Sequence, residues 1–284
     1  MRSVRHGVFL AALVASVCSL GCASGLRPLD AEIVTSDPAL LEATRSVSMM
    51  VSIPEMSGSR VRGSRRFTIK LSSLIFVGDD LALTAAHSVV GRPIDDPEAS
   101  GWSSRVLVGW RTMQARVLER GDPEHIQGEW ALVQLEGMRE GDASDDDGVP
   151  VPALATPVVG ERCVLIGYPQ RYLRDGWHRG APRLRSPTPD DATWRPPMPL
   201  VFEGRITGVN TPDGGHRVAI STEGEELGGL SGGGAFVLRG GAWHLIGPIA
   251  HDEQWVWKRE IGVTVLPPRV RSLISSVTAD TPGP

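Results

Sequence analysis

Short apolar stretches, separated by Gly, Pro, Asp and Asn, recur along the sequence from about Ser46, and this pattern limits the folds open to the chain. Many are four to eight residues long and rich in Val, Ile, Phe and Thr, as in 217–221, 235–238 and 261–265. Such stretches favour β-strands. About a dozen strands at this spacing predict an all-β fold, either a barrel or a sandwich. Only 269–277, directly after two prolines, has the pattern of a helix.

The composition is that of a soluble globular protein. Apolar residues make up 41% and charged residues 22% of the 284 residues, enough for one large or two modest domains. The net charge of −4 argues against a nucleic-acid partner, which normally requires a basic surface. No Cys/His cluster has metal-ligand spacing, so we expect neither a metal nor another cofactor. Cys163 is the only Cys after residue 22, and its apolar surroundings predict a buried, unpaired thiol.

The N-terminus has the pattern of a secretory signal peptide. Arg2 and Arg5 precede an apolar run of 13 residues, 8–20, and small residues follow. The segment 19–22 is similar to a bacterial lipobox, in which Cys22 would be lipidated and become the mature N-terminus. Simple secretion and an uncleaved anchor are the alternatives. We therefore expect an exported protein, either lipid-anchored in the cell envelope or periplasm or secreted, with membrane contact only through Cys22.

Three segments contain residues suited to nucleophilic catalysis. His87 ends the segment Thr84-Ala-Ala-His87, whose small residues allow neighbouring backbone to approach the imidazole. Glu129 stands directly before the apolar stretch 130–135. Ser231 is flanked by five glycines within 228–234. Glycines permit the positive φ angles that turn backbone N–H groups inward as an anion-binding nest.

Together these residues occur in the order His, acid, Ser, and the chain resembles the trypsin-like (chymotrypsin-fold) serine peptidases. The segment ending at His87 looks like the histidine motif of that family, and Gly229-Leu-Ser-Gly-Gly233 looks like its nucleophile motif. Gly167-Tyr-Pro169 and the segment 204–208 are similar to segments of its bacterial branches. The resemblance covers roughly residues 46–275.

The resemblance implies an all-β fold of two six-stranded antiparallel β-barrels with a short C-terminal helix. It also implies a serine endopeptidase that acts on proteins or peptides. In that reading His87, Glu129 and Ser231 form the catalytic triad, with His87 as the base that activates the hydroxyl. The backbone N–H groups of Gly229 and Ser231 would form the oxyanion hole. A catalytically inactive relative that binds a peptide or protein in the same cleft is the alternative.

Two positions depart from the family pattern. The family normally has Asp where Glu129 stands, so the longer side chain must approach His87 from a different backbone position. Asp122 is the alternative acid, because Gly121-Asp-Pro resembles a segment that often precedes the acid strand. Leu230 replaces the Asp that pairs with a freed N-terminus in digestive trypsins, which predicts that this chain lacks that activation switch.

The sequence patterns and the resemblance together suggest the following division of the chain: signal peptide 1–21, tether 22–45, N-terminal barrel 46–140, acidic connection 141–149, C-terminal barrel 150–275 with a loop insertion at 171–199, and tail 276–284.

The specificity pocket is the least constrained feature. Glu225 lies six positions before Ser231, where trypsins have the acid that selects Arg or Lys. A small or apolar pocket formed by Ile249 and Ala250 is the competing prediction, and His251 would lie at the rim. The other histidines, His216 among them, show no partner pattern and are expected at the surface.

Overall fold

The structure, a computed structural model, describes residues 28–54, 70–78, 80–89, 102–108, 111–136, 149–169, 198–212, 214–220, 228–250 and 260–280. The signal peptide and Cys22 lie outside these residues, as do Glu225, His251 and nearly all of the acidic connection and the loop insertion. Predictions about those parts are therefore not tested by the structure.

Six antiparallel strands form the first sheet, in the order β1-β2-β3-β6-β5-β4. Strand β1 pairs with β2 through Met49 and Ser73 and with β4 through Met49 and Leu107, so it has a neighbour on each side. The strands are β1 (Val47–Pro54), β2 (Lys70–Phe76), β3 (Leu81–Thr84), β4 (Trp102–Val108), β5 (Arg111–Arg120) and β6 (Ala131–Glu136).

The second sheet closes into a six-stranded antiparallel barrel in the order β10-β11-β12-β9-β8-β7, with β7 pairing back to β10. Gly240 and Gly241 join β10 to β11 with φ angles of 56° and 88°, the backbone that a tight hairpin turn requires. The strands are β7 (Arg162–Gly167), β8 (Leu200–Gly208), β9 (Gly215–Ile220), β10 (Gly234–Arg239), β11 (Ala242–Ala250) and β12 (Glu260–Thr264). The prediction of an all-β fold is confirmed in part, because the structure is mostly β but also contains helices.

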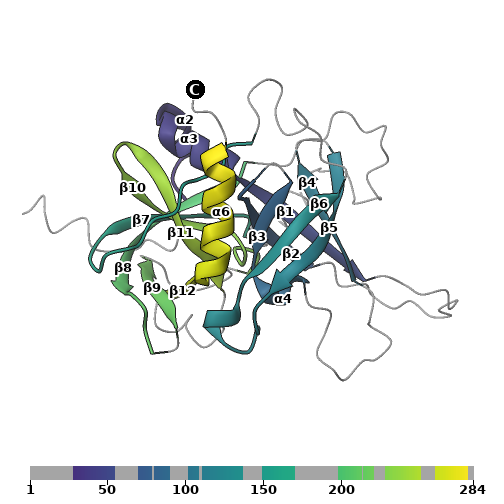
Figure 1. Ribbon diagram of the computed structural model, residues 1–284. Helices are drawn as coiled ribbons and strands as arrows, with labels where there is room; N and C mark the ends of the chain where they lie inside the picture. Colours follow the sequence, from purple (N-terminus) through teal and green to yellow (C-terminus); the bar gives the residue numbers. More distant parts are fainter. Residues whose placement is uncertain are drawn as a thin grey trace, which may run out of the picture.

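Four helices accompany the strands in the described part of the chain (Figure 1). They are α2 (Ala31–Ser36), α3 (Pro38–Arg45), α4 (Ala86–Val89) and α6 (Pro268–Asp280). Helix α6 matches the predicted C-terminal helix. Part of the expected tether is instead helical and packed, since Val34, Leu40 and Ala43 are buried. Asp37 caps α3 by accepting a hydrogen bond from the Leu40 backbone N–H at 3.1 Å. None of the described helices is long and apolar enough to cross a membrane.

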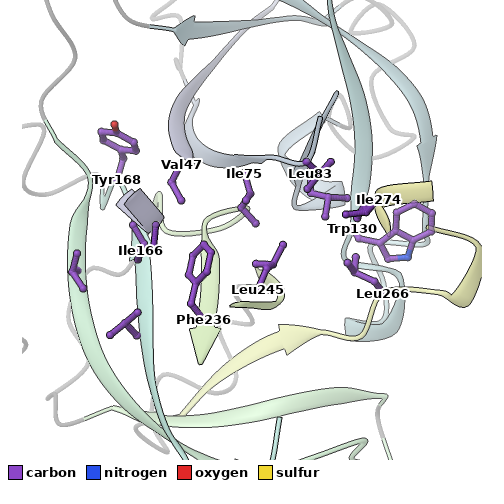
Figure 2. Packing of buried hydrophobic residues seen from close by; sticks show 14 of the residues in the cluster. Val47, Ile75, Leu83, Trp130, Ile166, Tyr168, Phe236, Leu245, Leu266 and Ile274 are labelled. Carbon is purple, nitrogen blue, oxygen red and sulfur yellow. The ribbon is translucent and has the colours of Figure 1, made fainter. Parts of the chain in front are cut away.

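One hydrophobic cluster joins the two sheets. Ile75 and Leu83 of the first sheet face Phe236 and Leu245 of the second, and all four are fully buried (Figure 2). Ile274 of α6 belongs to the same cluster. Burial of this much apolar surface holds the sheets in one fixed arrangement. Loops that leave the two sheets next to this cluster therefore keep a defined position relative to each other.

Candidate active site

His87 lies in the short helix α4, directly after strand β3. Ala85 and Ala86 are fully buried, so the chain is anchored immediately before the histidine. The His87 side chain is 40% exposed. The backbone thus fixes the position of His87, while part of its imidazole stays exposed to solvent.

The carboxylate of Glu129 contacts His87 in two ways. Its Oε2 is in direct contact with the imidazole Nδ1, and its Oε1 accepts a hydrogen bond from the His87 backbone N–H at 3.3 Å. The Glu129 side chain is only 8% exposed. A buried carboxylate held by two donors from one residue fixes both the ring and the backbone of that residue. The structure therefore brings Glu129 and His87 together, as the sequence predicted.

The loop before β6 sets the position of Glu129. A 3-10 turn, η3 (Ile126–Gly128), leads into it, and the Glu129 carbonyl accepts a hydrogen bond from Thr264 Oγ1 of β12 at 3.2 Å. Asp122, the alternative acid, is exposed, and its Oδ1 accepts from the Glu124 backbone N–H at 3.0 Å. Glu129 is the carboxylate in contact with His87.

Ser231 lies in a tight turn between two glycines with positive φ angles, Gly229 at 97° and Gly232 at 82°. The turn is fastened to strand β11, because the Gly232 N–H donates to the Ile249 carbonyl at 2.8 Å. Leu230 points into the second barrel, where it is 1% exposed. At this position an apolar side chain packs in the core.

The turn also touches the strand that leads to His87. A Cβ on Gly232 would lie 2.3 Å from Thr84 Oγ1 and 2.8 Å from the Ala85 nitrogen, so only glycine fits. The Ser73 N–H of β2 donates to the Ser231 carbonyl at 2.9 Å. Ser231 therefore sits at the junction of the two sheets, beside the segment that ends at His87.

The predicted pocket residues Ile249 and Ala250 lie at the end of β11, where they pair with β12 and are buried. Glu225 and His251 lie outside the described residues. Arg217 of β9 is also buried, at 5% exposure, and its Nη1 lies 3.1 Å from the place of a Gly262 Cβ. Its burial was not predicted, because an Arg within a strand pattern normally faces solvent.

Two other titratable side chains lie in the core. His216 was expected at the surface, but it is 2% exposed. Burial, together with the positive charge of Arg271, lowers the pKa of His216 to about 4. Burial also raises the pKa of the Cys163 thiol to about 12, which keeps it protonated and unreactive. Among the described residues no group of three metal-ligating side chains comes together.

A family model for the trypsin-like peptidase domain matches residues 72–247, more than half of the chain, and the chain belongs to this family. The matched segment contains His87, Glu129 and Ser231. A search of curated proteins gives no match.

The fold is similar to that of the Rv3671c protease from M. tuberculosis in its active form, at a TM-score of 0.51 and 16% identity over 93% of this chain and 95% of that one. A thermostable serine protease, AL20, from an extremophilic microorganism matches at a TM-score of 0.49 and 12% identity, over 84% of this chain and 100% of that one.

Proposed function

We propose that this chain is a serine endopeptidase that hydrolyses peptide bonds in a protein or peptide substrate through an acyl-enzyme. The observation that carries the proposal is the contact of buried Glu129 with His87, next to the glycine-rich turn of Ser231. In this proposal each six-stranded sheet forms a barrel, and the active site lies between the two barrels. The pairing of β1 with both β2 and β4 supports that description of the first sheet.

The reaction begins with transfer of the Ser231 hydroxyl proton to Nε2 of His87 as Oγ attacks the scissile carbonyl. A serine hydroxyl is a weak nucleophile at neutral pH, so this base is essential. His87 then returns the proton to the leaving amine, which departs and leaves the acyl-enzyme. Water, activated by the same imidazole, attacks the ester and releases the acid product.

Glu129 serves the base. Contact with Nδ1 keeps the proton on that nitrogen and leaves Nε2 free to accept one from Ser231. The negative charge also stabilises the imidazolium that forms during attack. The backbone N–H groups of Gly229 and Ser231 would bind the developing oxyanion, and one such donor contributes about 3–4 kcal/mol in enzymes of this type.

A fluorophosphonate probe tests the proposal directly, because it reacts only with an activated serine. We expect the probe to label Ser231 in the wild type and to label neither Ser231→Ala nor His87→Ala. Both variants should also lose peptide hydrolysis by several orders of magnitude, since triad members act as a unit. Lack of labelling in a folded wild type would favour a domain that binds peptides without cleaving them.

We also propose that the protein is exported. The basic and apolar pattern of residues 1–20 supports a signal peptide, and Cys22 supports a lipid anchor.

A further inference from the structure

Ser73, in strand β2 of the first sheet, connects the parts of the molecule that meet at Ser231. It is fully buried. Its backbone N–H donates to the Ser231 carbonyl at 2.9 Å, and its carbonyl accepts from Thr84 Oγ1 at 2.7 Å. One residue thus contacts the turn of the nucleophile and the strand that leads to His87.

The hydroxyl of Ser73 makes two further bonds, both to the second sheet's side of the junction. Its Oγ donates to the Gly229 carbonyl at 2.9 Å and accepts from the Tyr168 backbone N–H at 2.9 Å. The approach is close, because a Cβ on Gly167 would lie 2.9 Å from this oxygen. In the segment Gly167-Tyr-Pro169, the backbone N–H of Tyr168 thus has a structural role, because it donates to the Ser73 hydroxyl.

Gly229 needs such a fixed partner. Its φ of 97° and its lack of a Cβ leave the adjoining peptide planes free to rotate at little cost. The Gly229 carbonyl belongs to the peptide plane between Gly229 and Leu230, which lies between the two planes that carry the Gly229 and Ser231 N–H groups. A hydrogen bond to this carbonyl restricts ψ of Gly229 and φ of Leu230, and so limits how far the two donor planes can rotate relative to each other. Because catalysis depends on donors already aimed at the oxyanion, loss of this restraint weakens transition-state binding.

We propose that the Ser73 hydroxyl is a positioning group for the oxyanion hole, acting from the first sheet through the Gly229 carbonyl. The proposal rests on the proposed peptidase function, in which the Gly229 and Ser231 N–H groups bind the oxyanion. Ser73 itself contacts backbone only, so its effect should appear in transition-state binding and not in ground-state affinity.

Ser72 provides a matched control. It is the neighbouring serine of β2 and is also buried, at 4% exposure. Its Oγ has no hydrogen-bond partner among the residues that the structure describes. Ser72→Ala therefore removes the same atom from the same strand without removing a bond to the turn.

The experiment compares wild type, Ser73→Ala and Ser72→Ala by kcat and KM on a peptide substrate. It also compares their affinity for a peptide aldehyde, which forms an oxyanion on Ser231, with affinity for the matching alcohol. We expect Ser73→Ala to lower kcat by about 10- to 100-fold with KM within about twofold. Aldehyde affinity should fall by a similar factor and alcohol affinity should not change. Ser72→Ala should resemble wild type throughout.

Hydrogen exchange of the peptide that spans 228–233 gives a second readout that needs no catalysis. Faster exchange in Ser73→Ala than in Ser72→Ala is expected. Should Ser73→Ala fail to fold, Ser73→Cys keeps a weak donor and should show an intermediate kcat. Equal kcat, equal aldehyde affinity or equal exchange in the two alanine variants overturns the proposal. An inactive, unlabelled wild type with altered exchange in Ser73→Ala would instead overturn only the proposed function.

Discussion

Glu129 binds His87 through the ring Nδ1 and the backbone N–H at once, with Oε2 on the first and Oε1 on the second. Both contacts come from a carboxylate that is almost completely buried. The loop that ends in η3 supplies the backbone position that the longer side chain requires. An acid with one more methylene than the family norm thus reaches the imidazole in this fold.

The first prediction concerns this contact. Glu129→Gln should reduce kcat by up to about 10⁴-fold, because the amide stabilises the wrong imidazole tautomer and no longer offsets the imidazolium charge. Glu129→Asp keeps the charge but falls short of the ring, so an intermediate loss is expected. Steady-state kinetics on a peptide substrate measure both.

Asp122→Asn is the control, since Asp122 is exposed and engaged in its own turn. We expect it to retain wild-type kcat. A silent Glu129→Gln together with a damaging Asp122→Asn would show that the wrong acid was chosen.

The second prediction concerns the close approach at Gly232. Gly232→Ala places a methyl group against the Ser73 carbonyl of β2, the Thr84 hydroxyl of β3 and the Ala85 nitrogen, so the turn of Ser231 must shift. We expect a loss of about 2–4 kcal/mol in the free energy of unfolding. Activity should fall by about 10²-fold or more, because a small displacement of the nucleophile is enough.

Gly241→Ala separates strain from clash. Gly241 also has a positive φ, 88°, but nothing lies within 4 Å of its Cβ position. This variant should cost only about 1 kcal/mol and leave kcat unchanged. Chemical denaturation and peptide hydrolysis measure the two effects. If both variants lose the same free energy of unfolding and neither loses activity, the close packing of Gly232 against Thr84 and Ala85 is not needed for catalysis.

The sequence indicates the candidate site residues to different degrees. His87 and Ser231 each lie in a motif of consecutive residues, so both can be proposed from the sequence without a structure. Glu129 was harder, because an acid before a strand is ordinarily solvent-exposed, and only the fold brings it to His87. Ser73 had no sequence signal at all, since a serine in a strand shows its partners only when two distant segments meet.

In the segment 22–45 the structure contains helices that the sequence did not predict. Its lack of a strand pattern predicted a loose tether, yet Leu40 and Ala43 pack in the core. A helix of eight residues is too short for its periodicity to stand out, and Asp37 with Pro38 was the available signal for its start. Tertiary packing, and not local preference, stabilises such a helix.

The third prediction concerns location. If Cys22 is lipidated, the wild type should partition with membranes, and Cys22→Ser should release it in a soluble or uncleaved form. Mass spectrometry of the mature N-terminus measures the modification. An unmodified terminus at Ala23 or later would contradict lipidation and leave simple secretion.

The last prediction concerns His216 and the dependence of stability on pH. Its pKa is about 4 in the folded protein and 6.5 in the reference state, because burial and Arg271 both disfavour the charged ring. Between these values the unfolded chain binds a proton that the folded chain does not. The free energy of unfolding should therefore fall as the pH is lowered from about 6.5 towards 4.

The variant His216→Asn tests this prediction, because its side chain does not titrate. In the wild type the Asn210 N–H donates to His216 Nδ1 at 3.4 Å, and Oδ1 of the new Asn offers an acceptor in its place. Urea denaturation at pH 7.5, 6 and 5 measures the effect: the wild type should lose more stability than the variant over this range, and parallel curves for the two proteins would mean that His216 does not control the acid response.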